Sequence, residues 1–106
     1  MPKLDLDALR KAVAENRYLI SVHAKLRMGQ RRIVDRDVKH VVETGDIIEE
    51  HLRARPFPKA LFMAHVRSEP LYVCCAYDGV QAYLITVYWY DPAKWIDPWT
   101  RRKGEA

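Results

Sequence analysis

The spacing of apolar residues changes at Gly45, and this change constrains the fold more than any other feature of the chain. Before Gly45 the apolar residues recur every three or four positions, as they do on amphipathic helices. After Gly45, runs of β-branched and aromatic residues follow in the manner of strands. Four strands are predicted: Ile47–Leu52, Ala60–Val66, Leu71–Tyr77 and Val80–Trp89.

Short connections join the predicted strands, which favours antiparallel pairing of neighbours. Asp78-Gly79 predicts a two-residue hairpin turn because both residues tolerate a positive φ. Ser68–Pro70 is a weaker turn signal, and Arg53–Pro58 is predicted as a loop because its two prolines cannot donate to a strand ladder. We therefore expect a four-stranded, mostly antiparallel meander sheet.

Helices are predicted to precede this sheet and to pack on it. The first is capped by Asp5 and ends near Glu15-Asn16, the second runs from a cap at Ser21 to about Arg31, and the third runs from a cap at Asp35 to Gly45. Between the first two, Tyr18–Ile20 is a short extended segment. Helices followed by locally connected strands define an α+β fold, and the 106 residues suit a single domain spanning 1–106. The Asp91–Trp99 segment should cover one edge or end of the sheet.

One face of the second helix carries His23, Arg27 and Arg31, spaced one turn apart. Apolar residues border this stripe on both sides: Val22 and Leu26, and Ala24 and Met28. The residues assigned to the solvent face are Lys25, Gly29 and Arg32. A charged stripe between two apolar ridges is predicted to face a cleft or the body of the domain.

Two arginines held side by side need anionic partners, because an unpaired buried charge is costly. The partner could be internal, from Glu43, Glu49 or Glu50. It could also be the phosphates of a bound nucleic acid, which suit the planar guanidinium group. The residues alone leave both alternatives open.

The formal net charge of +4 and the pI of about 9.2 favour acidic partners such as nucleic acid. The N-terminus lacks the apolar segment of a secretory signal, and no apolar run reaches the roughly 18 residues of a membrane span. Adjacent Cys74 and Cys75 should point to opposite faces of a strand, so they are not expected to bond to each other. We expect a cytoplasmic protein with reduced thiols and no membrane partner.

The sequence contains no Gly-rich phosphate loop, zinc signature, nucleophile elbow or acidic metal cluster. The remaining chemistry is metal-independent acid–base catalysis on a phosphodiester, with no cofactor, in which some groups move protons and cations stabilise the phosphorane. Candidates to move protons are His23, Tyr72, Tyr88 and His65, and candidates to stabilise charge are Arg27, Arg31 and Lys59. His40 is interpreted as a surface residue and His51, at a strand end, as a residue without a role.

The segment His23–Ile33 resembles the opening motif of a bacterial family, the domain-of-unknown-function family 4258. Further landmarks follow in the family's order: Ile47–Glu50, Pro56, Pro58, Pro70–Val73, Ile85–Tyr88 and Trp95. The resemblance covers about residues 19–95. Two positions depart from it, since Tyr72 stands where the family often has histidine and Arg32 stands where glycine is usual.

The resemblance implies a fold similar to the RelE and BrnT toxins of the barnase–EndoU–colicin–RelE group. It also implies metal-independent RNA cleavage and a gene encoded beside an antitoxin. The chain is therefore expected to be an endoribonuclease toxin of a type II toxin–antitoxin pair. Its expected partners are RNA, including ribosome-bound mRNA, and a cognate antitoxin protein.

In this hypothesis Arg27 and Arg31 hold phosphate, and His23 or Tyr72 moves the proton. Tyr88 and Thr86 line the cleft, and Arg32 and Lys59 contribute to RNA binding. The first alternative is a non-catalytic RNA- or protein-binding module on the same fold. The second is a purely structural role, in which internal glutamates satisfy both arginines.

Overall fold

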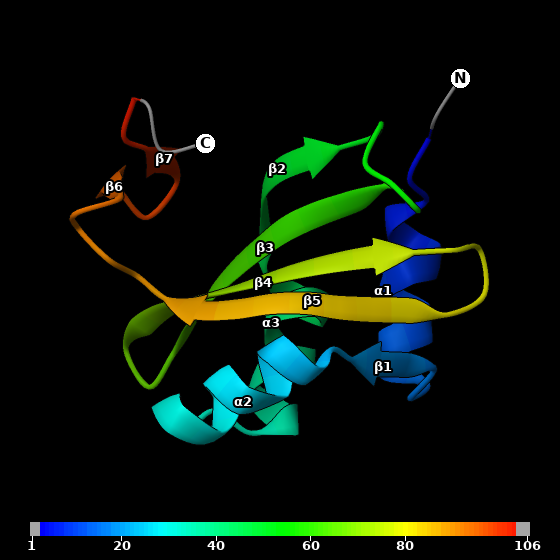
Figure 1. Cartoon of the computed structure of the whole chain (residues 1–106), viewed down its shortest axis with the longest axis horizontal. Helices are drawn as coiled ribbons and strands as arrows, with labels where there is room; N and C mark the ends of the chain where they lie inside the picture. The colour runs from blue at the N-terminus through cyan, green and yellow to red at the C-terminus, as the bar shows by residue number, and fades with distance from the viewer. Residues whose placement is uncertain (1–2, 104–106) are drawn as a thin grey trace.

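A computed structural model describes residues 3–103 (Figure 1). Its elements in chain order are α1 (Leu6–Ala14), β1 (Tyr18–Ile20), α2 (Val22–Arg31), α3 (Asp35–Thr44), β2 (Asp46–His51), β3 (Lys59–Val66), β4 (Glu69–Tyr77), β5 (Ala82–Trp89), β6 (Trp95–Asp97) and β7 (Thr100–Arg101). Five strands form one sheet in the order β1-β5-β4-β3-β2, and β6 pairs with β7 in a separate ribbon. The predicted α+β class is confirmed.

The sheet is mixed and five-stranded, because β1 joins it. β1 pairs in parallel with β5, with Tyr18 opposite Ala82, whereas the other neighbours are antiparallel. The four-stranded prediction was wrong in this detail. A three-residue strand carries little pattern of its own, and its partner lies far along the chain.

Side-chain hydrogen bonds cap the N-termini of the three helices. Asp5 accepts from the Ala8 N–H at 3.0 Å, and Ser21 accepts from the Ala24 N–H at 3.0 Å, as predicted. The third helix differs, because Val34 is its cap residue and the side chain of Asp37 accepts from the Val34 N–H at 3.0 Å. The predicted cap at Asp35 was therefore wrong by one residue.

Gly45 ends α3 as predicted, for a steric reason. Its φ of −75° is open to any residue. A Cβ atom at this position, however, would lie 2.4 Å from the Val41 carbonyl oxygen and 2.6 Å from that of Met63. Glycine is needed because α3 and β3 pass so close to each other here.

The two hairpin turns differ from their sequence signals. Asp78–Gln81 form a longer loop than the predicted two-residue turn, because the Asp78 carboxylate accepts from the N–H groups of Val80 and Gln81 at 2.8 and 2.7 Å. The turn between β3 and β4 lies at Arg67 and Ser68, which both have positive φ. Pro70 consequently lies inside β4, opposite His65.

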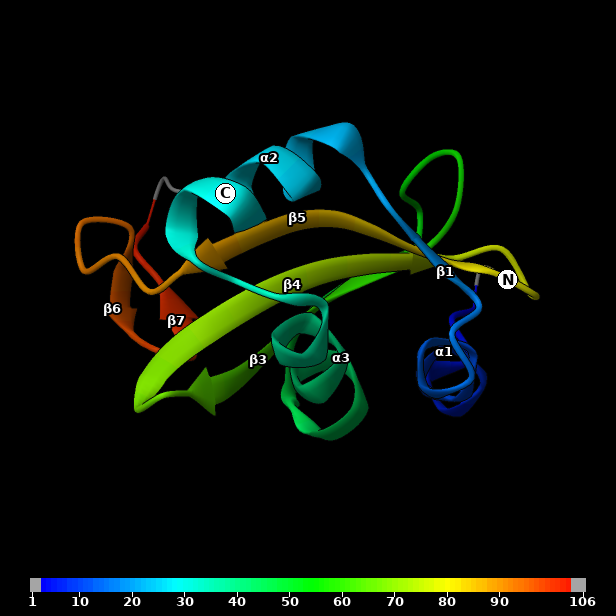
Figure 2. The same cartoon turned by 90° about the horizontal axis from the view of Figure 1, so that it is seen from below.

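The helices cover the sheet unequally. α1 and α3 pack on one face, and α2 lies beside β5 beyond the end of β1 (Figures 1 and 2). The main core between the sheet and α1 and α3 includes Leu9, Val38 and Phe62. No helix within residues 3–103 is long and apolar enough to cross a bilayer.

A smaller core lies on the other face of the sheet and consists of Leu61, Met63, Tyr72 and Trp95. The rings of Tyr72 and Trp95 stack with their centroids 4.5 Å apart. The prediction that Asp91–Trp99 covers an end of the sheet is thereby confirmed. Cys74 packs on this smaller core and Cys75 in the main one, so the two free thiols do point to opposite faces.

Only one of the two apolar ridges of α2 is buried. Ala24 and Met28 pack into the main core, whereas Val22 and Leu26 are 84% and 60% exposed. Of the two apolar ridges predicted to border the stripe, the one formed by Val22 and Leu26 therefore lies on the surface. The reason is that α2 packs beside a single strand, which covers only a narrow strip of the helix.

Candidate functional site

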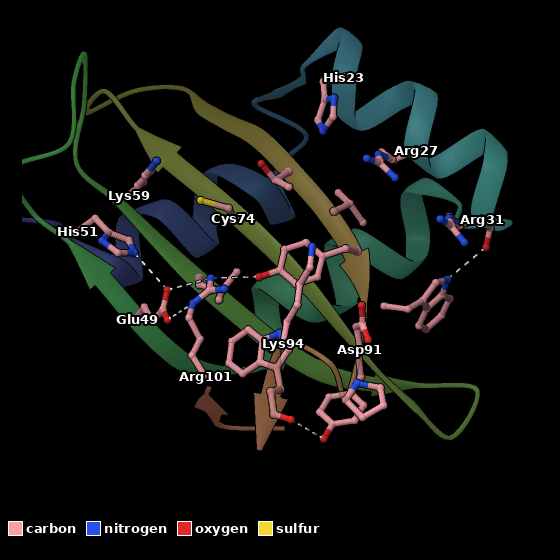
Figure 3. A pocket seen from close by; sticks show the side chains of 18 residues that line it. His23, Arg27, Arg31, Glu49, His51, Lys59, Cys74, Asp91, Lys94 and Arg101 are labelled. Carbon is pink, nitrogen blue, oxygen red and sulfur yellow. Dashed lines mark hydrogen bonds and ion pairs between the residues drawn. The ribbon is translucent and has the colours of Figure 1, made fainter. Parts of the chain in front are cut away.

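A cavity of about 640 Å³ opens on the sheet face opposite α1 and α3 (Figure 3). Side chains from β3, β4 and β5 line its floor, including Leu61, Cys74 and Thr86. α2 provides one wall, and the segment from Tyr90 to Arg101 provides another. The lining is rich in basic and aromatic side chains.

His23, Arg27 and Arg31 project from α2 towards this cavity (Figure 3). The end of the helix is held in place by Trp89, whose indole Nε1 donates to the Arg31 carbonyl oxygen at 3.3 Å. In the part of the chain that the structure describes, neither guanidinium group forms an ion pair with a carboxylate. The prediction of a cationic stripe facing a cleft is confirmed for these three residues.

Internal glutamates do not satisfy these arginines among the described residues. Glu49, one of the three candidates, pairs instead with Arg101 and His51. Glu43 and Glu50 form no ion pair with another described residue. The purely structural alternative is therefore not supported by residues 3–103.

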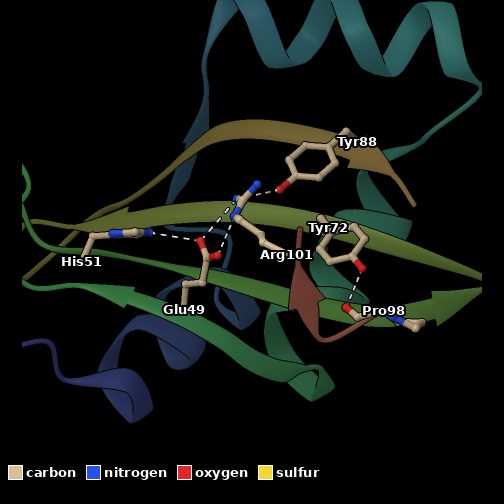
Figure 4. A network of polar contacts seen from close by, with 6 residues as sticks. All are labelled: Glu49, His51, Tyr72, Tyr88, Pro98 and Arg101. Carbon is tan, nitrogen blue, oxygen red and sulfur yellow. Dashed lines mark hydrogen bonds and ion pairs between the residues drawn. The ribbon is translucent and has the colours of Figure 1, made fainter. Parts of the chain in front are cut away.

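Opposite α2, Glu49 is the centre of a polar network (Figure 4). Its carboxylate accepts from Arg101 Nε at 2.5 Å and from Arg101 Nη2 at 3.2 Å, a two-pronged contact. The same carboxylate lies 3.2 Å from His51 Nε2. Arg101 also donates to the Tyr88 hydroxyl at 3.3 Å and lies over the Trp95 ring, 4.6 Å from its centroid.

The network and the burial of its members shift the pKa values of Glu49 and Tyr88. Partial burial raises the pKa of Glu49, but the hydrogen bond and charge of Arg101, followed by those of His51, outweigh it and hold the pKa below its ordinary value. Burial raises the pKa of Tyr88 in spite of the nearby Arg101 charge. At neutral pH the cavity therefore holds a Glu49 carboxylate and a neutral Tyr88 phenol.

The floor carries Cys74 beside the Lys59 side chain (Figure 3). Burial raises the pKa of the Cys74 thiol, and the positive charge of Lys59 offsets this in part. A protonated thiol is a poor nucleophile. Within residues 3–103, no group of three or more His, Cys, Asp or Glu side chains is arranged to hold a metal ion.

Most of the predicted site residues meet in this cavity, and three do not. Those that line it are His23, Arg27, Arg31, Lys59, Thr86 and Tyr88. His65 is exposed on β3, away from the cavity lining. Arg32 ends α2 with a positive φ of 57°, and its carbonyl oxygen accepts from Arg67; its side chain does not line the cavity either.

Tyr72 is the main departure from the predicted site. Its side chain is fully buried in the smaller core, and its hydroxyl donates to the Pro98 carbonyl oxygen at 2.5 Å (Figure 4). Burial, and then the neighbouring Tyr88 and Tyr90, raise the pKa of this phenol. Tyr72 therefore lies beneath the cavity, with its hydroxyl bonded to Pro98, and is not one of the lining residues.

Sequence reasoning missed Glu49, His51, Lys94 and Arg101 as lining residues. Glu49 and His51 stand two apart in β2, and alternate residues of a strand share a face, so this pair had a detectable signal. Arg101 had none. It reaches Glu49 because the β6–β7 ribbon folds back over the end of the sheet (Figure 1).

These features describe a small α+β domain with a basic, aromatic cavity beside an amphipathic helix. Residues 20–89 match the family described as domain of unknown function (DUF4258), and the chain belongs to this family. The match includes α2, Glu49 and His51, whereas Lys94, Trp95 and Arg101 lie beyond it. Neither the curated proteins nor the solved structures gave a significant match.

Proposed function

We propose that the cavity binds single-stranded RNA and cleaves it by metal-independent acid–base chemistry, as the toxin of a type II toxin–antitoxin pair similar to RelE and BrnT. One observation carries the proposal. Arg27 and Arg31, unpaired with carboxylates among the described residues, line the same cavity as the adjacent Glu49 and His51. The cavity thus combines places for phosphate with a proton acceptor and a proton donor.

The proposed reaction uses the RNA 2′-hydroxyl as the nucleophile. Glu49 accepts its proton, the 2′-oxygen attacks phosphorus, and the bond from phosphorus to the 5′-oxygen breaks. His51 donates a proton to the departing 5′-oxygen. The products are a 2′,3′-cyclic phosphate and a 5′-hydroxyl, while Arg101 and Lys59 offset the negative charge that builds up on the phosphorane.

Several features favour RNA as the substrate. The guanidinium groups of Arg27 and Arg31 are suited to phosphate oxygens. Tyr88, Trp89 and Tyr90 line the same cavity and provide ring faces on which unpaired bases can stack. The reaction also requires the 2′-hydroxyl, which DNA lacks.

A second function, RNA binding without cleavage, is favoured by the state of Glu49. Its lowered pKa makes it a weaker base, and Arg101 already contacts both of its carboxylate oxygens. For catalysis, Arg101 has to move from Glu49 towards the phosphate. A binding module requires no such movement.

The test uses a fluorogenic RNA oligonucleotide and purified protein in buffer with EDTA. The parent chain should cleave RNA but not the matching DNA. Glu49→Gln and His51→Ala should each slow cleavage by about 100-fold or more, because each removes a proton-transfer group. Glu50→Gln is the matched control: its carboxylate is exposed on the same strand and forms no ion pair with a described residue.

The outcomes separate the two functions. Salt-sensitive RNA binding without cleavage would establish the binding module. Cleavage that survives both Glu49→Gln and His51→Ala would disprove the proposed acid–base pair. Loss of RNA binding in Arg27→Ala, with binding retained in Arg36→Ala on α3, would assign phosphate binding to the α2 wall.

A further inference from the structure

One exposed line along α2 is apolar. Val22 and Leu26, one turn apart, are 84% and 60% exposed, although the solvent side of a surface helix is normally polar. Gly29 continues this line, and a Cβ atom added there would meet no atom of residues 3–103 within 4 Å. We call Val22, Leu26 and Gly29 the α2 crest. All three residues are exposed in the described part of the chain.

Arg27 and Lys25 place positive charge on the two sides of the α2 crest. From the helical periodicity, His23 and Arg27 lie on the cavity side and Lys25 lies on the opposite side. All three are exposed, and none forms an ion pair with a carboxylate among the described residues. The surface is therefore an apolar strip with two cationic borders.

A shallow groove adjoins the α2 crest on the Lys25 side. Its apolar lining comes from Ile20, Met28, Ile33 and Val34. Asp35 is the acidic residue in this lining, and its carboxylate accepts from the Tyr18 hydroxyl at 3.1 Å. The groove extends the apolar strip and gives a ligand a second ridge to pack against.

We propose that the α2 crest binds an amphipathic helix of a partner protein, with acidic residues on both borders of that helix's apolar face. The apolar side chains of the partner pack on Val22 and Leu26, and its carboxylates lie against Lys25 and Arg27. Paired helices with an apolar seam and oppositely charged borders follow this pattern. Gly29 allows the partner backbone to approach closely.

Charge distinguishes this partner from other occupants of the α2 crest. A second copy of this chain would bring the same cationic borders face to face, and like charges across an interface disfavour binding. A nucleic acid offers phosphates to the borders but no aliphatic surface to Val22 and Leu26. An acidic amphipathic helix offers carboxylates to the cationic borders and aliphatic side chains to the apolar strip.

Docking at this surface also affects the cavity, because His23 and Arg27 belong to both. A bound acidic helix covers the phosphate-binding wall and competes with RNA. This inhibitory consequence rests on the proposed function. The docking itself does not, since a domain without ribonuclease activity would keep the α2 crest.

The test uses labelled synthetic peptides of about 21 residues, or three heptads. The probe has leucine at its seam positions and glutamate at its border positions. One control peptide has lysine in place of glutamate, and another has the acidic sequence scrambled. Fluorescence anisotropy with the full chain at physiological salt gives the dissociation constants.

The acidic amphipathic peptide should bind, and the two control peptides should bind far more weakly. The double variant Val22→Ser/Leu26→Ser should raise the dissociation constant about tenfold or more, since two apolar contacts are lost. Val80→Ser is the matched control, because Val80 is 65% exposed on the loop between β4 and β5. It should leave the dissociation constant unchanged, and both variants should retain the parent circular dichroism spectrum.

Equal binding of the acidic peptide to the parent and the Val22→Ser/Leu26→Ser variant would overturn the proposal. So would equal binding of the lysine peptide, or a parent dimer in sedimentation that becomes a monomer in this variant. The RNA assay distinguishes the two proposals. Peptide binding without RNA binding would disprove the proposed function alone. RNA cleavage without peptide binding would disprove the docking surface alone.

Discussion

Replacing Tyr72 with phenylalanine separates a structural role of this residue from a catalytic one. The change removes one hydroxyl, which donates to the Pro98 carbonyl oxygen at 2.5 Å. It keeps the ring, which stacks on Trp95 at 4.5 Å and on Tyr88 at 5.1 Å between centroids. A single neutral hydrogen bond contributes about 0.5–1.5 kcal/mol to stability. For a domain of this size, a loss of 1 kcal/mol lowers Tm by roughly 4–8 °C.

Urea unfolding and thermal melts measure the stability change, and RNA cleavage and binding assays measure function. We expect Tyr72→Phe to lose about 1 kcal/mol with an unchanged urea dependence of the free energy. Its RNA activity should stay close to that of the parent. Tyr72→Ala should lose about 3–5 kcal/mol, because it empties a fully buried site in the smaller core.

Tyr83→Phe is the matched control, since the Tyr83 hydroxyl donates to the Asp78 carboxylate at 2.8 Å in an exposed setting. This variant should lose less stability than Tyr72→Phe, because water can replace an exposed partner. Full stability combined with a loss of RNA activity in Tyr72→Phe would refute the structural role. That result would mean that the hydroxyl reaches the ligand in spite of its burial.

Three further predictions follow from the cavity wall, the Glu49 network and the glycines. Arg27→Ala/Arg31→Ala should make the negative slope of log affinity against log salt for single-stranded RNA shallower by about 1.4, as expected for two lost phosphate contacts. An unchanged slope in binding titrations would exclude these contacts. The folded-state pKa of Glu49 lies below the ordinary 4.5, so the carboxylate stabilises the fold above that pH and loses this contribution as pH falls through the folded value. The stability difference between parent and Glu49→Gln in urea unfolding should therefore be full at pH 7 and shrink below about pH 4.5; a difference that grows in acid would contradict the sign. Gly45→Ala should destabilise the domain by about 1–3 kcal/mol or more, because the added Cβ atom clashes with the backbone. Gly29→Ala should stabilise the domain by about 0.5–1 kcal/mol in thermal melts, because alanine favours the helix and its Cβ atom meets no described atom within 4 Å.

Local patterns in the sequence predicted the elements that depend on local interactions. The caps at Asp5 and Ser21 and the end of α3 at Gly45 came from short-range signals. The sequence predicts β1 as an extended segment but not as part of the sheet, because its pairing with β5 is a long-range contact. The Asp78 loop differs because a side chain, rather than the turn residues alone, satisfies its backbone.

The helical wheel predicted the cationic stripe but not which apolar ridge would be buried. The periodicity treats Val22 and Leu26 like Ala24 and Met28, since each pair has the same spacing. Burial depends on what packs against α2, and a single strand covers one ridge alone. The exposed ridge is then a property of the tertiary arrangement, and it is the feature from which we infer a partner helix.

The cavity combines parts that the sequence reveals to different degrees. His23, Arg27 and Arg31 follow from periodicity, and Glu49 and His51 from strand alternation, so both sets can be located by local rules. Arg101 depends on a chain reversal through Trp95, whose ring packs on Tyr72 and lies beneath the Arg101 guanidinium. Because Trp95 and Arg101 lie beyond the family match, membership of the family does not by itself imply the Glu49–Arg101 pair. A relative that matches in α2 and β2 but lacks this pair would keep the α2 wall that we propose binds phosphate. The pKa of its Glu49 equivalent would be higher, so this carboxylate would be a stronger base. Comparing the pH dependence of RNA cleavage between such a relative and this chain would test whether Arg101 restrains the acid–base pair.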